Sequence, residues 1–204
     1  MSKIKNLIAG WLAVLWSVVP WQAMNSTKVQ SQQEKTSTEI ATVFDENKIN
    51  DDTFEIWMDT IDHEQFIHKN ISEIFDEYGE EKWLLLVNQH LLIELNKIRV
   101  ENGAKELVLD DQIIQLAQKQ AIHLDSLDKI FHENFWDRLD ANNIEYNSYW
   151  ENLWLWQTNI DDIVKQWMTS PWHSSNIKKR SFKKMWLGLI YNKRWNIWVL
   201  NFIW

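Results

Sequence analysis

Apolar side chains in the second half of the chain recur at spacings of three and four residues, which is the spacing of one face of a helix. The first such stretch begins at Trp83 and ends near Gly103. The second follows Asp110 and the third follows Asn159, two residues that can cap a helix N-terminus. Pro171 ends the third stretch, because proline cannot continue a helix. The pattern predicts three amphipathic helices.

The end of the chain changes to strict alternation. Residues 187–191 and 197–203 alternate apolar side chains in the manner of strands, and residues 192–196 form a short polar connection between them. This predicts an antiparallel hairpin. Helices followed by a terminal hairpin favour an α/β domain in α-β-α layers.

The first residues have the pattern of a secretory signal peptide. Lys3 and Lys5 precede an apolar stretch from Leu7 to about Val19, and Ala23 offers a cleavage point. A membrane anchor is the less favoured alternative, because the stretch is shorter than the roughly 20 residues of a spanning helix. We therefore expect residues 1–23 to be a signal peptide and the protein to be secreted or associated with the cell envelope.

An acidic arm is expected between this signal and the helices. Residues 24–52 are polar and are expected to be flexible, whereas residues 53–80 contain enough apolar positions for one or two amphipathic helices. The predicted organisation is a signal peptide at 1–23, an arm at 24–82 and a folded domain at 83–204.

Charge and cysteine content exclude several classes of function. The net charge of −8 argues against nucleic acid as the main partner. The excess of acidic groups lies in residues 24–82, while the two signs balance in residues 83–204. The chain has no cysteine, so disulfides, thiolate metal sites and a cysteine nucleophile are excluded. An exported chain without cysteine is typical of bacteria.

The tryptophans are unusual in number and in place. The chain has 15 Trp and 4 Gly, although an average protein has about 7% Gly. Many of the Trp residues lie in polar, turn-like segments that favour glycine. We hypothesise that these positions are UGA codons read as glycine in the cell: Trp11, Trp16, Trp21, Trp136, Trp150, Trp154, Trp156, Trp172, Trp186, Trp195 and Trp204. The alternative is a tryptophan-rich surface that binds glycans or membranes.

Two histidines and one glutamate are candidates for chemistry. His132, Glu151 and His173 each lie in a segment expected to be irregular and next to a turn, where a scaffold can present side chains. Two imidazoles and a carboxylate could bind Zn²⁺ with an open fourth position, or could form an acid–base cluster. The other four histidines are expected to have structural or solvated roles.

Six segments carry a family resemblance. They are Leu95–Arg99 with Asn102-Gly103, Leu109-Asp110 with the helix of Ala117 and Ala121, Phe131–Arg138 (H-x-x-F-G-x-R), Trp150–Leu153 (G-E-N-I/L), Trp167–Ile177 (W-x-x-S-P-G-H-x-x-N-I/L) and Met185–Gly188 (I-G-V/I-G). In combination they resemble the CAP superfamily, also called SCP-like, in its bacterial extracellular branch, over about residues 84–204. Trp stands where the family has Gly at 136, 150, 172 and 186, which agrees with recoding.

The resemblance implies a fold and a site. The fold would be a three-layer α-β-α sandwich with a small, largely antiparallel central sheet, and His132, Glu151 and His173 would line its cleft. The second glutamate of many eukaryotic members is missing, since Ser170 stands at its place.

The resemblance also implies two functions. The favoured one is a secreted, non-enzymatic binding module whose cleft holds Zn²⁺, another divalent ion or a lipid-like ligand. The alternative is a metal-assisted hydrolase acting on peptide or envelope material. The expected partner is an extracellular or envelope ligand, and contact with a membrane is expected only through the signal peptide.

Overall fold

The computed structural model describes residues 60–79, 82–132, 135–192 and 194–204. The predicted signal peptide at 1–23 and the predicted arm up to residue 59 lie outside the described residues.

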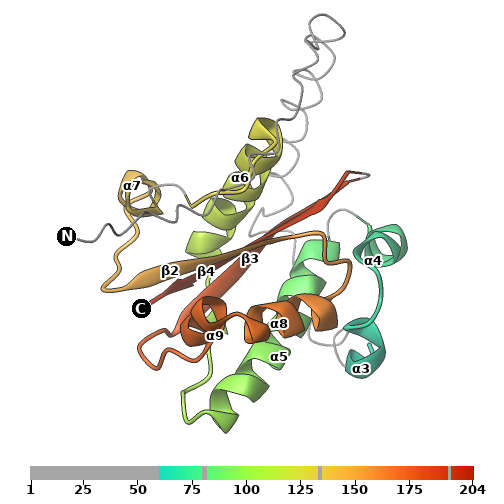
Figure 1. Cartoon of the computed structure of the whole chain (residues 1–204), viewed down its shortest axis with the longest axis horizontal. Helices are drawn as coiled ribbons and strands as arrows, with labels where there is room; N and C mark the ends of the chain where they lie inside the picture. Colours follow the sequence, from blue (N-terminus) through green and yellow to red (C-terminus); the bar gives the residue numbers. More distant parts are fainter. Residues whose placement is uncertain (1–59, 80–81, 133–134, 193) are drawn as a thin grey trace, which may run out of the picture. The chain divides into compact units, whose positions relative to one another are not determined.

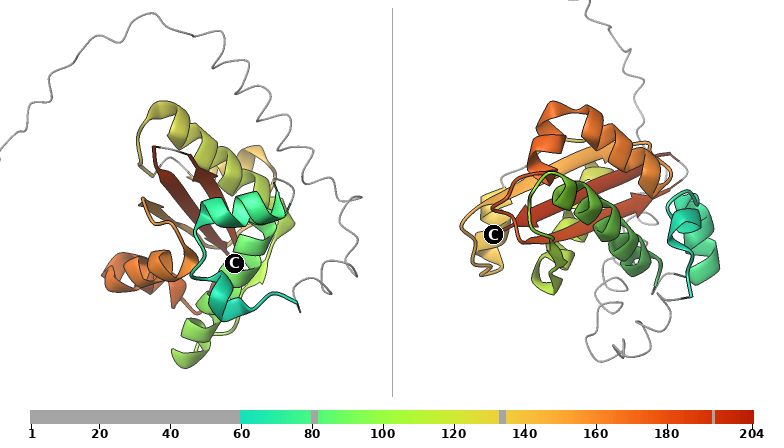
Figure 2. Two further views of the ribbon diagram at one scale, coloured as in Figure 1. Left: turned by 90° about the vertical axis from the view of Figure 1, so that its right-hand side faces the viewer. Right: turned by 90° about the horizontal axis from the view of Figure 1, so that it is seen from below.

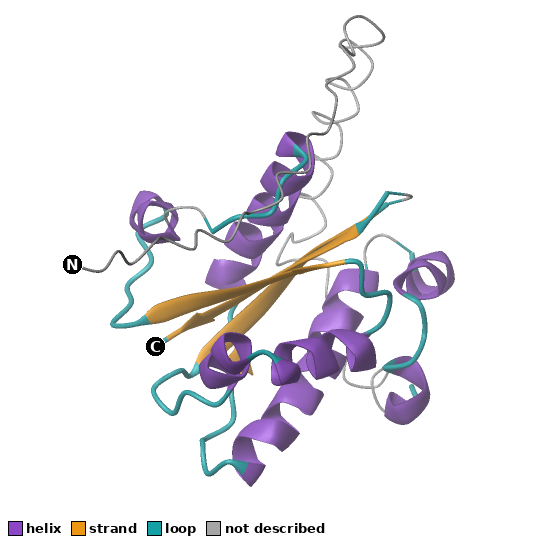
Figure 3. Ribbon diagram, in the orientation of Figure 1, coloured by secondary structure: helices purple, strands orange, loops and turns teal. Residues whose placement is uncertain are grey.

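A four-stranded sheet forms the middle of the described fold (Figure 3). Its strand order is β1-β3-β4-β2; β1 runs parallel to β3, and the other neighbours are antiparallel. The strands are β1 (Val108–Leu109), β2 (Tyr149–Leu155), β3 (Lys184–Tyr191) and β4 (Asn196–Ile203). The predicted terminal hairpin and the largely antiparallel sheet are thus confirmed. Strand β2 was not predicted, and its segment was wrongly expected to be irregular.

Helices cover both faces of the sheet, in the predicted α-β-α layers (Figure 1). One face carries α5 (Trp83–Glu101), α8 (Ile160–Thr169) and α9 (Pro171–Ile177), and the other carries α6 (Asp111–Leu127). A short helix, α7 (Phe135–Ala141), precedes β2. Because side chains alternate along a strand, Leu187 and Leu189 of β3 pack against the α5 side, while Trp186 packs against the α6 side.

The contact between α6 and the sheet is closest at Gly188 of β3. A Cβ atom at this position would lie 2.1 Å from the carbonyl oxygen of Ala117 on α6. No side chain fits at that distance, so only glycine allows α6 to lie so close to β3.

Local signals in the sequence mark the helix ends as predicted. The side chain of Asn159 accepts a hydrogen bond from the backbone N–H of Asp162 (2.8 Å), and that of Asp110 accepts one from Ile113 (3.2 Å). Helix α5 ends at Glu101 with Asn102 as its C-cap, and Gly103 follows with φ +71°. These caps satisfy backbone groups that a helix end leaves without partners.

Two short helices precede α5, which confirms the prediction for the described part of residues 53–80. They are α3 (His63–Phe66) and α4 (Ile71–Tyr78), and Figure 2 shows both beside α5. Phe66, Ile71 and Ile74 are buried in the same apolar cluster as Leu187 and Leu200 of the sheet. The described end of the arm therefore contributes to the core of the domain, and a domain boundary at residue 83 stays a prediction.

Among the described residues, no helix combines the length and the apolar character that a membrane crossing needs.

Candidate functional site

The three residues predicted to line the cleft lie around β2, a strand at the edge of the sheet. Glu151 is on β2 itself, His173 is on α9, and His132 precedes α7. The expectation of irregular segments holds for His132 and is wrong for Glu151 and His173. Glu151 lies in a regular strand because Tyr149–Leu155 pair with β4 along their whole length.

Glu151 is a buried carboxylate with two protein partners. Glu151 is 5% exposed. Its Oε2 accepts a hydrogen bond from Nη2 of Arg138 at 2.9 Å, and its Oε1 lies 3.1 Å from Nδ1 of His132. The guanidinium compensates the charge that burial would otherwise make costly. The site thus contains the fixed ion pair of Glu151 and Arg138, with the largely exposed imidazole of His132 beside it.

The main chain of His173 is bonded to β2 through Asn152, the neighbour of Glu151. Glu151 shares its face of the strand with Leu153, which packs on the α6 side. The adjacent residues face α9: Nδ2 of Asn152 donates to the carbonyl oxygen of His173 (3.2 Å), and the ring of Trp154 lies 5.5 Å from the ring of His173. Burial, followed by the charge of His132, lowers the pKa of His173 below its usual value. Its neutral form is therefore favoured.

The donor atoms of these three residues do not converge on one point. Among the described residues, the group of possible metal ligands whose donor atoms all lie within 4.8 Å of one another is His63, Glu64 and Glu94. A metal ion shared by His132, Glu151 and His173 would require side-chain movement. Their role as ligands stays a prediction.

Several buried polar atoms near Glu151 have no protein partner. They include Nε and Nη1 of Arg138 and both amide atoms of Asn201. Asn201 is fully buried and lies opposite Glu151 in the register of β4 and β2. Buried polar groups without partners are rare, so these atoms mark a place where a polar ligand or water would be stabilised.

Sequence reasoning assigned no role to Arg138 or Asn201. Arg138 carried a signal, because it ends the H-x-x-F-G-x-R segment. Asn201 is a polar residue in an apolar strand, and only the strand register reveals its place beside Glu151.

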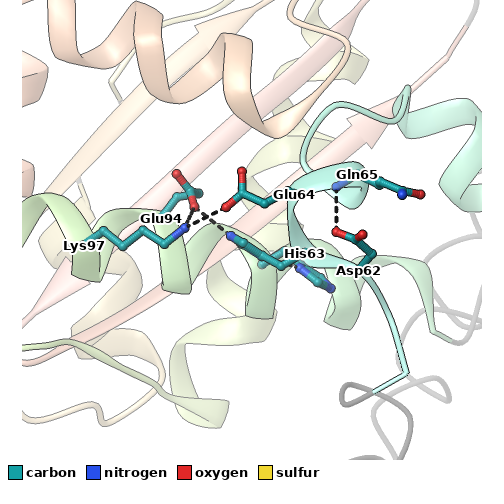
Figure 4. Close-up of polar contacts among 7 residues, drawn as sticks. Asp62, His63, Glu64, Gln65, Glu94 and Lys97 are labelled. Atoms are coloured by element: carbon teal, nitrogen blue, oxygen red, sulfur yellow. Dashed lines mark hydrogen bonds and ion pairs between the residues drawn. The ribbon is translucent and has the colours of Figure 1, made fainter.

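A second cluster of histidine and carboxylate groups lies where α3 meets α5 (Figure 4). Nε2 of His63 is 2.7 Å from Oε1 of Glu94, and Nδ1 of His63 is 2.7 Å from Nδ1 of His90. His90 is 1% exposed; burial, with a smaller contribution from His63, lowers its pKa to about 4. From the sequence alone, both histidines were expected to have structural or solvated roles. Their contact spans 27 residues, so no local pattern could reveal it.

A cavity of about 310 Å³ also lies near this second cluster and not at β2. Its lining includes Asp62, Gln65, Lys69 and Tyr78, from α3, α4 and their connections. It holds none of the predicted cleft residues.

Comparison with known proteins gives the family. The model of the CAP family, described as the cysteine-rich secretory protein family, matches residues 92–202, more than half of the chain. The chain therefore belongs to the CAP family, a family of extracellular type, and the predicted family and fold class are confirmed.

One curated relative is a bacterial protein. The uncharacterized protein YkwD of Bacillus subtilis (strain 168) is 26% identical over 118 residues, which are 55% of this chain and 45% of YkwD. The chain thus matches less than half the length of this curated relative.

Two solved structures have a similar fold. An outer surface protein of Borrelia burgdorferi has a TM-score of 0.52 and 22% identity, over 56% of this chain and 90% of the Borrelia protein. An extracellular protein of Bacillus anthracis str. Ames that contains an SCP domain has a TM-score of 0.51 and 18% identity, over 59% of this chain and 42% of the Bacillus protein. At these identities the likeness concerns the fold alone.

Proposed function

We propose that the protein is an exported CAP-domain binding module that holds a small oxygen-rich ligand at the β2 edge, beside Glu151. The observation that carries the proposal is the set of buried polar atoms of Arg138 and Asn201 without protein partners. A ligand oxygen would provide the acceptors that the N–H groups of Arg138 and Asn201 lack, and a ligand hydroxyl or water would donate to Oδ1 of Asn201. Either a lipid headgroup or the water shell of a divalent ion bound by His132 and His173 offers such oxygens.

The hydrolase alternative has less support. Glu151 could act as a general base only by giving up a present contact, since both of its carboxylate oxygens already have protein partners. Ser170 at the place of the second family glutamate removes another acid. The arrangement of charges fits recognition better than bond cleavage.

The sequence and the family together support export. Residues 1–23 have the three parts of a signal peptide. One of the proteins with a similar fold is itself described as extracellular. Both observations support secretion or association with the cell envelope.

Recoding of tryptophan belongs to the same proposal, because it decides the shape of the β2 edge. Trp156 has φ +81°, a backbone conformation that suits glycine and strains a bulky side chain. Trp172 is 81% exposed beside His173. Trp186 and Trp195 behave otherwise: Trp186 is buried, and the indole of Trp195 donates to Asp125 at 2.7 Å. The codons in the gene test each position, and mass spectrometry of the native protein reads the residue directly.

The binding function is tested with the full chain, made once with the printed tryptophans and once with glycine at the eleven positions. Both chains also carry Glu64→Gln and Glu94→Gln, so that Zn²⁺ held by the histidine–carboxylate cluster between α3 and α5 does not mask the result. Zn²⁺ titration by calorimetry and flotation with phosphatidylcholine vesicles measure the two ligand classes. Binding of either class that is lost in His132→Ala and Arg138→Gln, and retained in the surface control His68→Ala, supports the proposal. Failure of both classes to bind in either chain would overturn it. Hydrolysis of an envelope peptide that disappears in His132→Ala or His173→Ala would replace it with the hydrolase.

A further inference from the structure

We propose that His63, Glu64 and Glu94 form a binding site for a divalent transition-metal ion of the Zn²⁺ type, at the contact between α3 and α5. This site shares no residue with the β2 edge and does not depend on the function proposed there. It joins two neighbouring residues of α3 to a residue of α5 that is thirty positions further along the chain.

The distances between the donor atoms fit one ion. One nitrogen and two carboxylate oxygens lie within 4.8 Å of one another. Zn²⁺ binds histidine nitrogen and carboxylate oxygen at about 2.0–2.2 Å, so tetrahedral ligands lie roughly 3.3 Å apart. Nε2 of His63 and Oε1 of Glu94 lie 2.7 Å apart, so these two atoms need to separate only slightly to bind one ion. Water would complete the coordination.

His63 is held in place by a neighbour, as metal-binding histidines generally are. Its Nδ1 meets Nδ1 of the buried His90, which leaves Nε2 directed at Glu94. His90 in turn stacks on Phe66, with ring centroids 3.9 Å apart. The second ring nitrogen of His90 is buried and has no protein partner. His90 therefore orients the ligand without occupying the site.

A cation already lies between the two carboxylates. Nζ of Lys97 is 2.7 Å from Oε1 of Glu94 and 3.4 Å from Oε1 of Glu64 (Figure 4). His90, Glu94 and Lys97 follow one another at four and three residues and so share one face of α5. The Lys97 side chain is half exposed and can swing into water. The ammonium shows that the local charge favours a cation, and a doubly charged ion would replace it.

The donor set indicates the class of ion. Imidazole nitrogen favours Zn²⁺ and its transition-metal neighbours, whereas Ca²⁺ and Mg²⁺ prefer sites made only of oxygen. One nitrogen with two carboxylates therefore fits Zn²⁺ better than Ca²⁺.

Binding would fasten α3 to the domain. His63 and Glu64 lie outside residues 92–202, the segment that the family model matches, while Glu94 lies inside it. The ion would thus tie a segment outside the family match onto a helix that the match reaches.

Calorimetric titration of the full chain with Zn²⁺ tests the site. The β2 edge is first disabled by His132→Ala and His173→Ala, so that only the α3–α5 site is measured. We expect one site per chain, with at least about tenfold weaker Zn²⁺ binding in Glu64→Gln, because the loss of even an outer-shell partner of a metal ligand typically costs about 10–100-fold. The matched control is Glu77→Gln, which removes another exposed glutamate with a lysine partner, Lys69. It should bind Zn²⁺ unchanged.

Glu64 is largely exposed, so Glu64→Gln should fold normally, as circular dichroism can verify. Lys97→Ala should tighten Zn²⁺ binding, because the ion no longer competes with the ammonium. The proposal is overturned if the double variant binds no Zn²⁺, if Glu64→Gln binds as tightly as its parent, if Lys97→Ala does not bind more tightly, or if Ca²⁺ binds as well as Zn²⁺.

Discussion

The two histidine–carboxylate clusters have opposite distributions of burial. At the β2 edge the carboxylate of Glu151 is buried and the imidazole of His132 is exposed. At the α3–α5 contact the imidazole of His90 is buried, while the carboxylate of Glu64 is exposed. A buried carboxylate needs a fixed cation, and Arg138 supplies it. The carboxylate of Glu64 is exposed and needs none, and that of Glu94 is partly buried beside a half-exposed lysine, so this cation can exchange. The first cluster is therefore a rigid part of the fold, and the second is accessible to an ion from solvent.

Removal of the cation at each cluster should give the largest difference. Arg138→Ala leaves the charge of Glu151 buried without its partner, and we expect the free energy of unfolding to fall by about 3 kcal/mol. Lys97→Ala breaks exposed ion pairs and should change it by less than about 1 kcal/mol. Urea denaturation of both variants measures the two values. Equal losses would show that the two clusters do not differ in rigidity.

Removal of a histidine at each cluster should give the opposite order, with the larger loss of stability at the α3–α5 contact. His63→Ala removes the hydrogen-bond partner of the buried His90, and we expect a loss of about 1–2 kcal/mol. His132→Ala removes an exposed ring with one contact and should cost less than about 1 kcal/mol. Thermal denaturation with a metal chelator present compares them free of bound ions. A larger loss for His132→Ala would contradict the view that the contact of His63 with the buried His90 contributes more to stability than the contact of His132 with Glu151.

Glycine in place of Trp156 should stabilise the β2 edge. Its φ of +81° strains a residue with a side chain by roughly 1–2 kcal/mol, and we expect Trp156→Gly to regain about 1 kcal/mol. The control is Trp172→Gly, which places glycine in α9, where glycine costs up to about 1 kcal/mol relative to alanine. Chemical denaturation should show a gain for the first variant and none for the second. A loss in Trp156→Gly would argue that this tryptophan is native.

The smallest expected effect is on the pKa of His173, which NMR titration of the metal-free protein measures. Burial is the larger cause of its lowered pKa and the charge of His132 the smaller. His132→Ala should therefore raise the pKa of His173 part of the way toward 6.5. A lowered pKa means that the unfolded chain binds more protons, so the contribution of His173 to stability falls as the pH drops below 6.5. An unchanged pKa in the variant would show that the two rings do not interact across β2.

Much of the fold was readable from local patterns. The apolar spacing of α5, α6 and α8, the caps at Asp110 and Asn159 and the terminal hairpin all depend on neighbours within a few residues. Motif resemblance also selected His132, Glu151 and His173 as a group, and the fold brings them around one strand. Of these three residues, the fold brings only His132 and Glu151 into direct contact.

The sequence by itself determined the helices and hairpin, the class of fold and the family, because periodicity, caps and motifs are local properties of the chain. Tertiary structure alone decided which charges meet. Strand register places Asn201 beside Glu151, and the packing of α3 on α5 places His63 between His90 and Glu94. Such contacts join residues tens of positions apart, and their energies depend on burial and direction. Neither burial nor direction is present in the order of residues along the chain.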